Sequence, residues 1–102
     1  LKNLTNLSLS NNQLTVLPEQ IGALENLEEL NLSNNQLTEL PKRIGELENL
    51  TNLYLMDNQL TNLPQEFGEL KNLTLAYLSG NPIPEALREN IKRLLPDCFI
   101  TF

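Results

Sequence analysis

The side chains that could carry out chemistry in this sequence are few: one cysteine and several neighbouring carboxylates. The 102 residues include no histidine, so dyads that pair Ser or Cys with His, and metal sites built on imidazole, are absent. Cys98 alternates with Ile100 near the end of the chain, a pattern typical of a small buried apolar residue rather than a nucleophile. The sequence therefore predicts a protein that is not an enzyme and has no cofactor.

Neighbouring carboxylates occur in three places, and their positions indicate a solvated surface rather than acid–base chemistry. The pairs are Glu28 with Glu29, Glu46 with Glu48, and Glu66 with Glu69. Asp57, together with Asn34 and Asn58, suggests a weak cation site. A calcium loop needs more oxygen ligands at fixed spacing, so we expect no metal to bind there.

The overall charge limits the kinds of partner. The chain has 13 acidic and 7 basic side chains, a net charge of -6, whereas nucleic-acid binding needs clustered Lys and Arg. The same excess of negative charge disfavours anionic membrane surfaces. No run approaches the roughly 20 apolar residues of a membrane-spanning helix. We therefore expect no nucleic-acid partner and no membrane span. A single cysteine is compatible with either a reducing or an oxidising compartment.

The elements that position these side chains follow a repeat of 23 residues, seen in the spacing of Leu4, Leu27, Leu50 and Leu73. Ten positions recur in three consecutive copies; in the first copy they are Leu4, Leu7, Leu9, Asn12, Leu14, Leu17, Pro18, Ile21, Gly22 and Leu24. A fourth copy begins at Leu73 but has Ala76 where a leucine is expected. Such a period predicts a solenoid, in which each copy buries its apolar face against the next.

Each copy contains the signals of one strand and one tight turn. The Leu-x-Leu element has a period of two and predicts a short strand whose leucines point inward. The Leu-Pro pair and the apolar spacing after it predict a 3₁₀-like turn on the opposite side, over residues 18–27 in the first copy. The asparagine after each strand can satisfy backbone groups left unpaired where the chain turns: Asn12, Asn35, Asn58 and Asn81. The repeat glycines are expected where a backbone conformation or close approach excludes a side chain: Gly22, Gly45 and Gly68.

The run Leu-x-x-Leu-x-Leu-x-x-Asn-x-Leu, followed by Leu-Pro-x-x-Ile-Gly-x-Leu, resembles the leucine-rich-repeat (LRR) family over residues 1–84. It is most similar to the bacterial 23-residue type, notably the short LRR proteins of spirochaetes, and next to the Ras-group LRR scaffolds of eukaryotes. The resemblance implies an α/β solenoid: a curved right-handed stack with short parallel strands on the concave face and 3₁₀ or turn segments on the convex face. We expect one domain over residues 1–102. Within it, residues 1–3 end a truncated repeat, 4–26, 27–49 and 50–72 are full repeats, 73–83 is a partial repeat, and 84–102 is a C-terminal cap.

The cap is expected to cover the apolar C-terminal end of the stack with a helix and a strand. Pro84 suits the first turn of a helix, and apolar residues then recur at helical spacing: Leu87, Ile91, Leu94 and Leu95. The tail alternates, so Cys98, Ile100 and Phe102 are expected to cover the last leucine layer from an edge strand. The sequence from residue 91 onward also resembles the ends of the spirochaete proteins.

The N-terminal end carries no such cap. The chain opens in the middle of a repeat, without an initiator methionine or a signal peptide, and we expect that an upstream segment was removed. The first strand would expose its backbone edge and the side of the leucine core, at Leu4, Leu7 and Leu9. Such edges pair with other chains or exchange elements. One hypothesis is therefore a structural role, as a homodimer or domain swap through this edge.

Binding specificity is expected at the outward strand positions, where the copies differ. The first two copies carry mostly small polar groups there, whereas the third and fourth bring tyrosine, methionine and leucine together. Tyr and Met are enriched at interface cores, and clustered exposed apolar groups often mark contact sites. The predicted protein-binding patch on the concave face comprises Tyr54, Met56, Leu75, Tyr77, Glu29, Asn31, Asn52 and Asp57.

Two other interpretations of these positions stay open. A cross-strand pair of Tyr54 and Tyr77 could merely stabilise the sheet. A one-residue bulge at Leu75 and Ala76 could return Leu75 to the core, which would weaken the patch. The resemblance itself implies a module that binds a protein partner of unknown identity. It also favours a secreted or cell-surface bacterial protein that meets a host or envelope partner.

Overall fold

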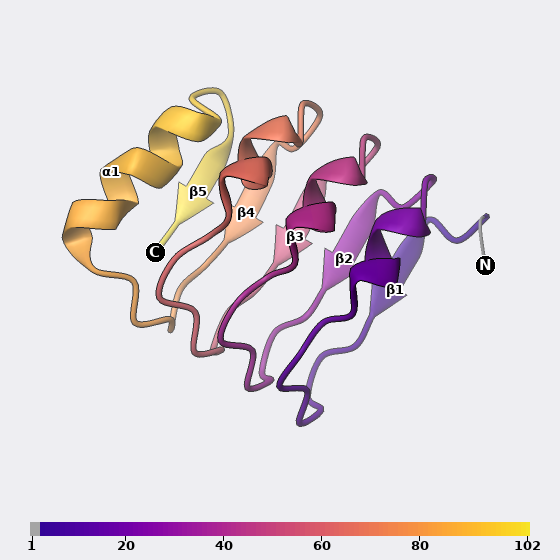
Figure 1. The fold of residues 1–102 in the computed structure, drawn as a ribbon, viewed down its shortest axis with the longest axis horizontal. Helices are drawn as coiled ribbons and strands as arrows, with labels where there is room; N and C mark the ends of the chain where they lie inside the picture. The colour runs from indigo at the N-terminus through magenta and orange to yellow at the C-terminus, as the bar shows by residue number, and fades with distance from the viewer. Residues whose placement is uncertain (1–2) are drawn as a thin grey trace.

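Each copy of the repeat folds as a short strand on one side of the molecule and, where the copy is complete, a 3₁₀ helix on the other (Figure 1). The computed structural model describes residues 3–102. Within this range one parallel sheet holds, in chain order, β1 (Asn6–Ser8), β2 (Glu29–Asn31), β3 (Asn52–Tyr54), β4 (Leu75–Tyr77) and β5 (Phe99–Thr101). The 3₁₀ helices are η1 (Glu19–Ala23), η2 (Lys42–Glu46) and η3 (Gln65–Glu69), and helix α1 (Glu85–Leu94) follows β4. The solenoid predicted from the period is confirmed.

The strands pair in register at the 23-residue period, which brings equivalent residues of successive copies side by side. Leu7 pairs with Leu30, and Leu30 with Leu53. Because alternate side chains of a strand point to opposite faces, this column lies in the core while its sequence neighbours point outward. Leu30 and Leu53 are fully buried. The period therefore predicts the register as well as the presence of the strands.

Leucines from every turn of the stack build the core. In the second and third copies many leucines are fully buried, among them Leu27, Leu32, Leu37, Leu47, Leu50, Leu55 and Leu60. In the first copy Leu17 is buried, whereas Leu4, Leu7 and Leu9 pack against the core and stay partly exposed. That these three leucines form an edge that pairs with another chain stays a prediction.

The asparagines after the strands satisfy the backbone where the chain turns, as their spacing predicts. The Asn35 amide donates to the Leu32 carbonyl oxygen at 2.9 Å and to that of Leu9, in the preceding copy, at 3.0 Å. Its side-chain oxygen accepts the Leu14 N–H at 3.1 Å. Asn58 makes the same set of bonds one copy later and, like Asn35, is buried. Each of these amides therefore ties two neighbouring copies together.

Two of the three repeat glycines mark a close approach between successive 3₁₀ helices. A Cβ on Gly22 would lie 2.7 Å from the Arg43 carbonyl oxygen, and one on Gly45 would lie 2.6 Å from a carbonyl oxygen of η3. Gly68 instead faces α1, where a Cβ would keep 3.4 Å from its nearest neighbour, an ordinary contact. The expectation that all three positions exclude a side chain is therefore wrong for Gly68.

Helix α1 and strand β5 cover the C-terminal end, as the sequence predicts. Ile91 of the helix is buried, and β5 pairs with β4 so that Ile100 lies opposite Ala76. Cys98, Ile100 and Phe102 pack, partly buried, against the core. The Phe102 ring also lies 5.6 Å from the Arg88 guanidinium and 5.9 Å from the Lys92 ammonium. Among residues 3–102 no helix is long and apolar enough to cross a membrane.

Candidate functional site

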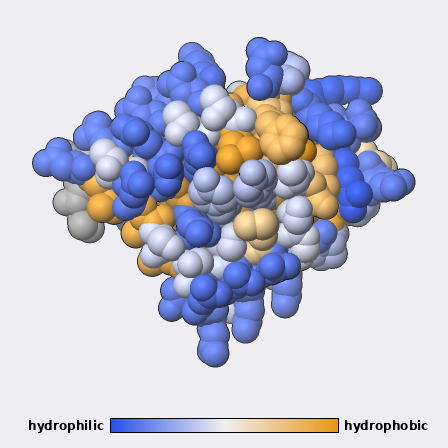
Figure 2. Space-filling view, turned by 180° about the vertical axis from the view of Figure 1, so that it is seen from behind, coloured by the Kyte–Doolittle hydropathy of each residue, from blue (hydrophilic) through white to orange (hydrophobic). Residues whose placement is uncertain are grey.

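The outward side chains of the five strands form one continuous surface, called here the strand face. Its two columns follow the strand register: Asn6, Glu29, Asn52, Leu75 and Phe99 in the first, and Ser8, Asn31, Tyr54, Tyr77 and Thr101 in the second. The columns are polar over β1 and β2 and become apolar and aromatic over β3, β4 and β5. Figure 2 shows apolar groups gathered near the middle of the molecule on this side, toward the C-terminal end of the stack.

The two tyrosines meet on neighbouring strands. Tyr54 and Tyr77 are directly opposite in the β3–β4 register, and their ring centroids lie 5.5 Å apart at an interplanar angle of 61°. The Asn52 amide donates to the Tyr54 hydroxyl at 3.1 Å. Both rings stay partly exposed. The sequence brings these residues to one face, and the structure adds that Asn52 holds one of the rings in place.

Leu75 lies on the strand face rather than in the core. It pairs with Asn52, whereas Ala76 pairs with Leu53 and is fully buried. The side chain of Leu75 is partly exposed. The alternative of a bulge that returns Leu75 to the core is therefore wrong, because β4 keeps the uninterrupted register of the other strands.

Phe99 extends the apolar surface and was missing from the predicted patch. It pairs with Leu75 across β4 and β5 and is 60% exposed. The alternation of the tail contains the signal for this position: if Cys98 and Ile100 point inward, Phe99 must point outward. We call Tyr54, Met56, Leu75, Tyr77 and Phe99 together the apolar patch.

Met56 continues the Tyr54 column just beyond the end of β3. Leu55 between them is fully buried, so the inward–outward alternation persists, and Met56 is partly exposed. The Met56 N–H donates to the Ser33 hydroxyl at 3.1 Å. Ser33 itself is only 4% exposed. In the column that contains Ser33 and Met56, the Met56 side chain is therefore accessible to a partner and the Ser33 side chain is not.

Asp57 begins the turn after β3 and stays exposed. Its φ of 58° is left-handed, as at Asn11 and Asn34 in the earlier copies, and Gly80 takes this place in the fourth copy with a φ of 80°. The Asp57 carboxylate packs against Gly80, where no Cβ would fit. Asn58 points inward and is 5% exposed. Asp57 and Asn58 thus do not converge on one cation, and among residues 3–102 no group of three or more His, Cys, Asp or Glu could hold a metal ion.

The remaining members of the predicted patch form its polar, N-terminal side. The Glu29 carboxylate is exposed and accepts a long hydrogen bond of 3.4 Å from the Asn6 amide. The Asn31 side-chain oxygen accepts the Ser33 N–H at 3.0 Å. Negative charge on β2 therefore lies beside the apolar patch on β3, β4 and β5.

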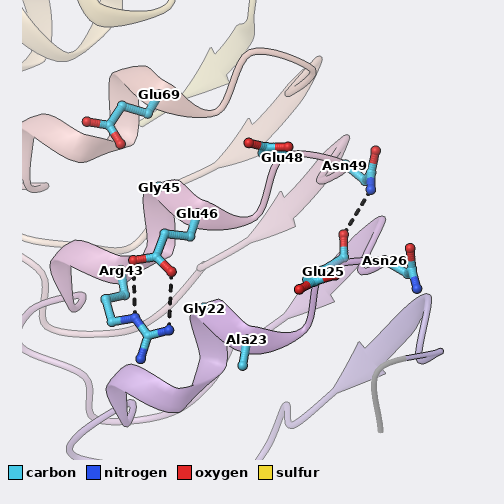
Figure 3. Close-up of a pocket in the computed structure, with 10 residues that line it drawn as sticks. All are labelled: Gly22, Ala23, Glu25, Asn26, Arg43, Gly45, Glu46, Glu48, Asn49 and Glu69. Carbon is cyan, nitrogen blue, oxygen red and sulfur yellow. Dashed lines mark hydrogen bonds and ion pairs between the residues drawn. The ribbon is translucent and has the colours of Figure 1, made fainter.

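A hollow of about 710 Å³ lies on the opposite side, along η1 and η2 (Figure 3). Its lining is polar, with the carboxylates Glu25, Glu46, Glu48 and Glu69. The Arg43 guanidinium donates to both Glu46 oxygens at 3.2 Å, and this hydrogen-bonded carboxylate raises the pKa of Arg43 above its ordinary value. The hollow therefore resembles the solvated carboxylate surface expected from the sequence.

Cys98 has the environment of a packing residue. Burial raises the pKa of its thiol, and Sγ donates a weak hydrogen bond to the Phe99 carbonyl oxygen at 3.7 Å. A raised pKa keeps the thiol protonated at neutral pH, and the protonated thiol is a poor nucleophile.

The comparisons agree with this architecture. The family described as leucine-rich repeat region matches residues 1–95, so the chain belongs to the leucine-rich-repeat family. A solved structure of an LRR protein from Leptospira interrogans matches with a TM-score of 0.97 and 51% sequence identity. The match covers 98% of this chain and 26% of that chain, so this chain spans about a quarter of that protein's length. No curated protein matches. The resemblance to bacterial, spirochaete-type LRR proteins is thereby confirmed.

Proposed function

We propose that this chain is a protein-binding module that receives its partner on the strand face, centred on the apolar patch. The observation that carries the proposal is the contrast between copies at equivalent positions. Ser8 and Asn31 occupy the column that Tyr54 and Tyr77 continue, and Leu75 and Phe99 follow Asn52 in the other column. The fold tolerates polar groups at these positions, so folding alone does not require the apolar ones.

The physical character of the patch supports binding. Aromatic side chains and methionine are enriched in interface cores because they bury a large area with few rotatable bonds. Tyr54 loses little further freedom on binding, since Asn52 and Tyr77 already hold its ring. Stabilisation of the sheet accounts for the tyrosine pair. It gives no reason for Phe99 to leave 60% of its surface in water.

A capture experiment with matched variants tests the proposal. The variant Tyr54→Ala/Tyr77→Ala is compared with wild type and with Ser8→Ala/Ser10→Ala, which changes the polar end of the same face. Proteins retained by wild type and the serine control but lost by the tyrosine variant are purified, and their affinities are measured. We expect the tyrosine change to weaken binding at least about tenfold, because interface-core tyrosines often contribute about 2 kcal/mol or more. Unchanged affinity in a variant with unchanged circular dichroism would contradict the proposal.

The biological setting is proposed from the family resemblance alone. We propose that the module acts in a secreted or cell-surface protein, where its partner belongs to a host or to the bacterial envelope. Protease treatment of intact source cells tests this, since a surface protein is cleaved and an internal one is protected.

Self-association is the alternative function. The partial exposure of Leu4, Leu7 and Leu9 is the observation in its favour. Light scattering at high protein concentration tests it, and a monomer at every concentration would contradict it.

A further inference from the structure

We infer that the partner is a basic peptide segment, in which a Lys or Arg lies four residues from the large apolar side chain that the patch buries. The inference rests on the proposed function and adds the chemistry of the partner to it. Three features support the inference. The strand face carries negative charge, no neighbouring cation among the described residues pairs with it, and it lies at a defined distance from the apolar patch.

The strand face carries negative charge only. Its ten outward positions include Glu29 and no Lys or Arg, and Asp57 adds a second carboxylate next to Met56. Among the described residues, neither carboxylate forms an ion pair with a cation. Within residues 3–102 the ion pairs are Arg43 with Glu46 and Lys92 with Glu89. The hydrogen-bonding neighbour of Glu29 is the neutral Asn6 amide. A partner's cation would therefore gain an electrostatic contact on this face without displacing another cation.

The register sets the spacing between charge and patch. Glu29 pairs with Asn52, Asn52 with Leu75, and Leu75 with Phe99. Neighbouring strands lie about 4.8 Å apart, so Glu29 lies about 10 Å from Leu75 and about 14 Å from Phe99 along this column. An extended peptide advances about 3.3 Å per residue. A segment that crosses the strands with its apolar side chain between Leu75 and Phe99 therefore places the fourth residue along beside Glu29. That residue's side chain points to the same face as the apolar one, because side chains alternate along an extended peptide.

The charge of the whole molecule acts in the same direction. The net charge is -6, so a basic segment is attracted from a distance and an acidic one is repelled. Complementary charge chiefly raises the rate of association and selects among partners, while the buried apolar contacts supply much of the affinity. The patch and the carboxylates thus have separate roles, which separate variants can test.

The experiment selects peptides from a random phage-displayed 12-residue library on the whole protein. The same library is selected in parallel on four variants of the protein. Glu29→Gln removes the charge, Glu29→Lys reverses it, and Glu39→Gln removes one charge at an exposed position away from the strand face. Tyr54→Asn/Leu75→Asn gives the patch the polar residues that Asn31 and Asn52 provide in neighbouring strands. Enriched peptides are synthesised, and their dissociation constants are measured by fluorescence anisotropy.

We expect wild type and Glu39→Gln to enrich peptides with Lys or Arg four positions from an aromatic or large aliphatic residue. Glu29→Gln should weaken the binding of these peptides about two- to fivefold, the range of an exposed ion pair. Added salt should reduce the difference in affinity between this variant and wild type. Glu29→Lys should select acidic residues at the same spacing. Circular dichroism and thermal unfolding show whether each variant keeps the fold.

Four results would overturn the inference. If peptides depend on Tyr54 and Leu75 but show no basic preference, or if Glu29→Lys leaves the preference unchanged, the proposed function stands and the partner chemistry is wrong. If no enriched peptide depends on the patch, the proposed function fails as well. If light scattering shows a dimer that Tyr54→Asn/Leu75→Asn dissociates, the occupant of the patch is a second copy of this chain.

Discussion

Tyr54 and Tyr77 lie directly opposite each other on β3 and β4, with ring centroids 5.5 Å apart and an interplanar angle of 61°. An edge-to-face arrangement of this kind places the positive rim of one ring against the negative face of the other. The pair is therefore both a stabilising contact of the sheet and the centre of the proposed binding surface. The first prediction concerns the stabilising contribution alone.

A double-mutant cycle measures the stabilising part. We expect Tyr54→Ala and Tyr77→Ala to show a coupling free energy of about 0.5–1.5 kcal/mol, the range for aromatic pairs. Urea unfolding of wild type, both single variants and the double variant provides the four free energies of unfolding. A coupling near zero would mean that the rings touch without stabilising the sheet. Each single variant should still unfold cooperatively, because equivalent positions in β1 and β2 carry Ser8 and Asn31.

The asparagines after the strands (Asn12, Asn35, Asn58 and Asn81), called here the asparagine ladder, should contribute more to the free energy of unfolding where they are buried. Asn58→Ala leaves the Leu37 N–H without its acceptor. It also removes one of two amide donors from each of the Leu32 and Leu55 carbonyl oxygens, which still accept from Asn35 and Asn81. The buried unpaired N–H costs about 1–3 kcal/mol, and each of the two lost amide bonds costs about 0.5–1.5 kcal/mol, so we expect a loss of at least about 2 kcal/mol in the free energy of unfolding. Asn12→Ala is the matched control at an exposed ladder position. It should lower the free energy of unfolding by about 1 kcal/mol. Equal losses at the two positions would show that the ladder is not the source of the effect.

The repeat glycines predict opposite outcomes for the same substitution. In Gly45→Ala the new Cβ would meet a backbone oxygen of η3 at 2.6 Å, and we expect a destabilisation of about 1–3 kcal/mol from overpacking. In Gly68→Ala the nearest neighbour is at 3.4 Å, so the reduced freedom of the unfolded chain should dominate and stabilise by up to about 1 kcal/mol. Thermal unfolding of the two variants should shift the midpoint in opposite directions, and a shared direction would contradict the close approach.

The Cys98 thiol predicts a loss of stability at alkaline pH. Burial raises its pKa in the folded state above the ordinary value of 9.0, so the unfolded chain releases this proton at lower pH than the folded chain does. The contribution is therefore complete below about pH 9 and is lost as the pH rises through the folded-state pKa. Urea unfolding of wild type and Cys98→Ala across this range should show a difference that shrinks with rising pH. A difference that stays constant above pH 9 would mean that the thiol is not shielded.

Much of the architecture follows from local patterns that repeat. The alternation at Leu30 and Leu32 predicts a strand, and the 23-residue spacing of such pairs predicts the register that β1, β2 and β3 adopt. The asparagine column is predictable for the same reason, since a buried turn must satisfy its backbone groups. The tail pattern at Cys98, Ile100 and Phe102 likewise predicts the covering strand. In each case one side-chain type at one spacing has a single favourable placement.

The binding surface depends on contacts that local patterns leave open. Leu75 and Ala76 are both apolar, and a shift of one residue exchanges the faces of a strand, so only pairing with β3 and β5 decides which of them is exposed. The same pairing places Phe99 beside Leu75. The sequence by itself determined the stack, its period and the tyrosines on its face. The tertiary structure decided between the two placements left open for Leu75 and brought Phe99 beside it, because the hydrogen-bonded register of neighbouring strands selects the face on which each side chain lies.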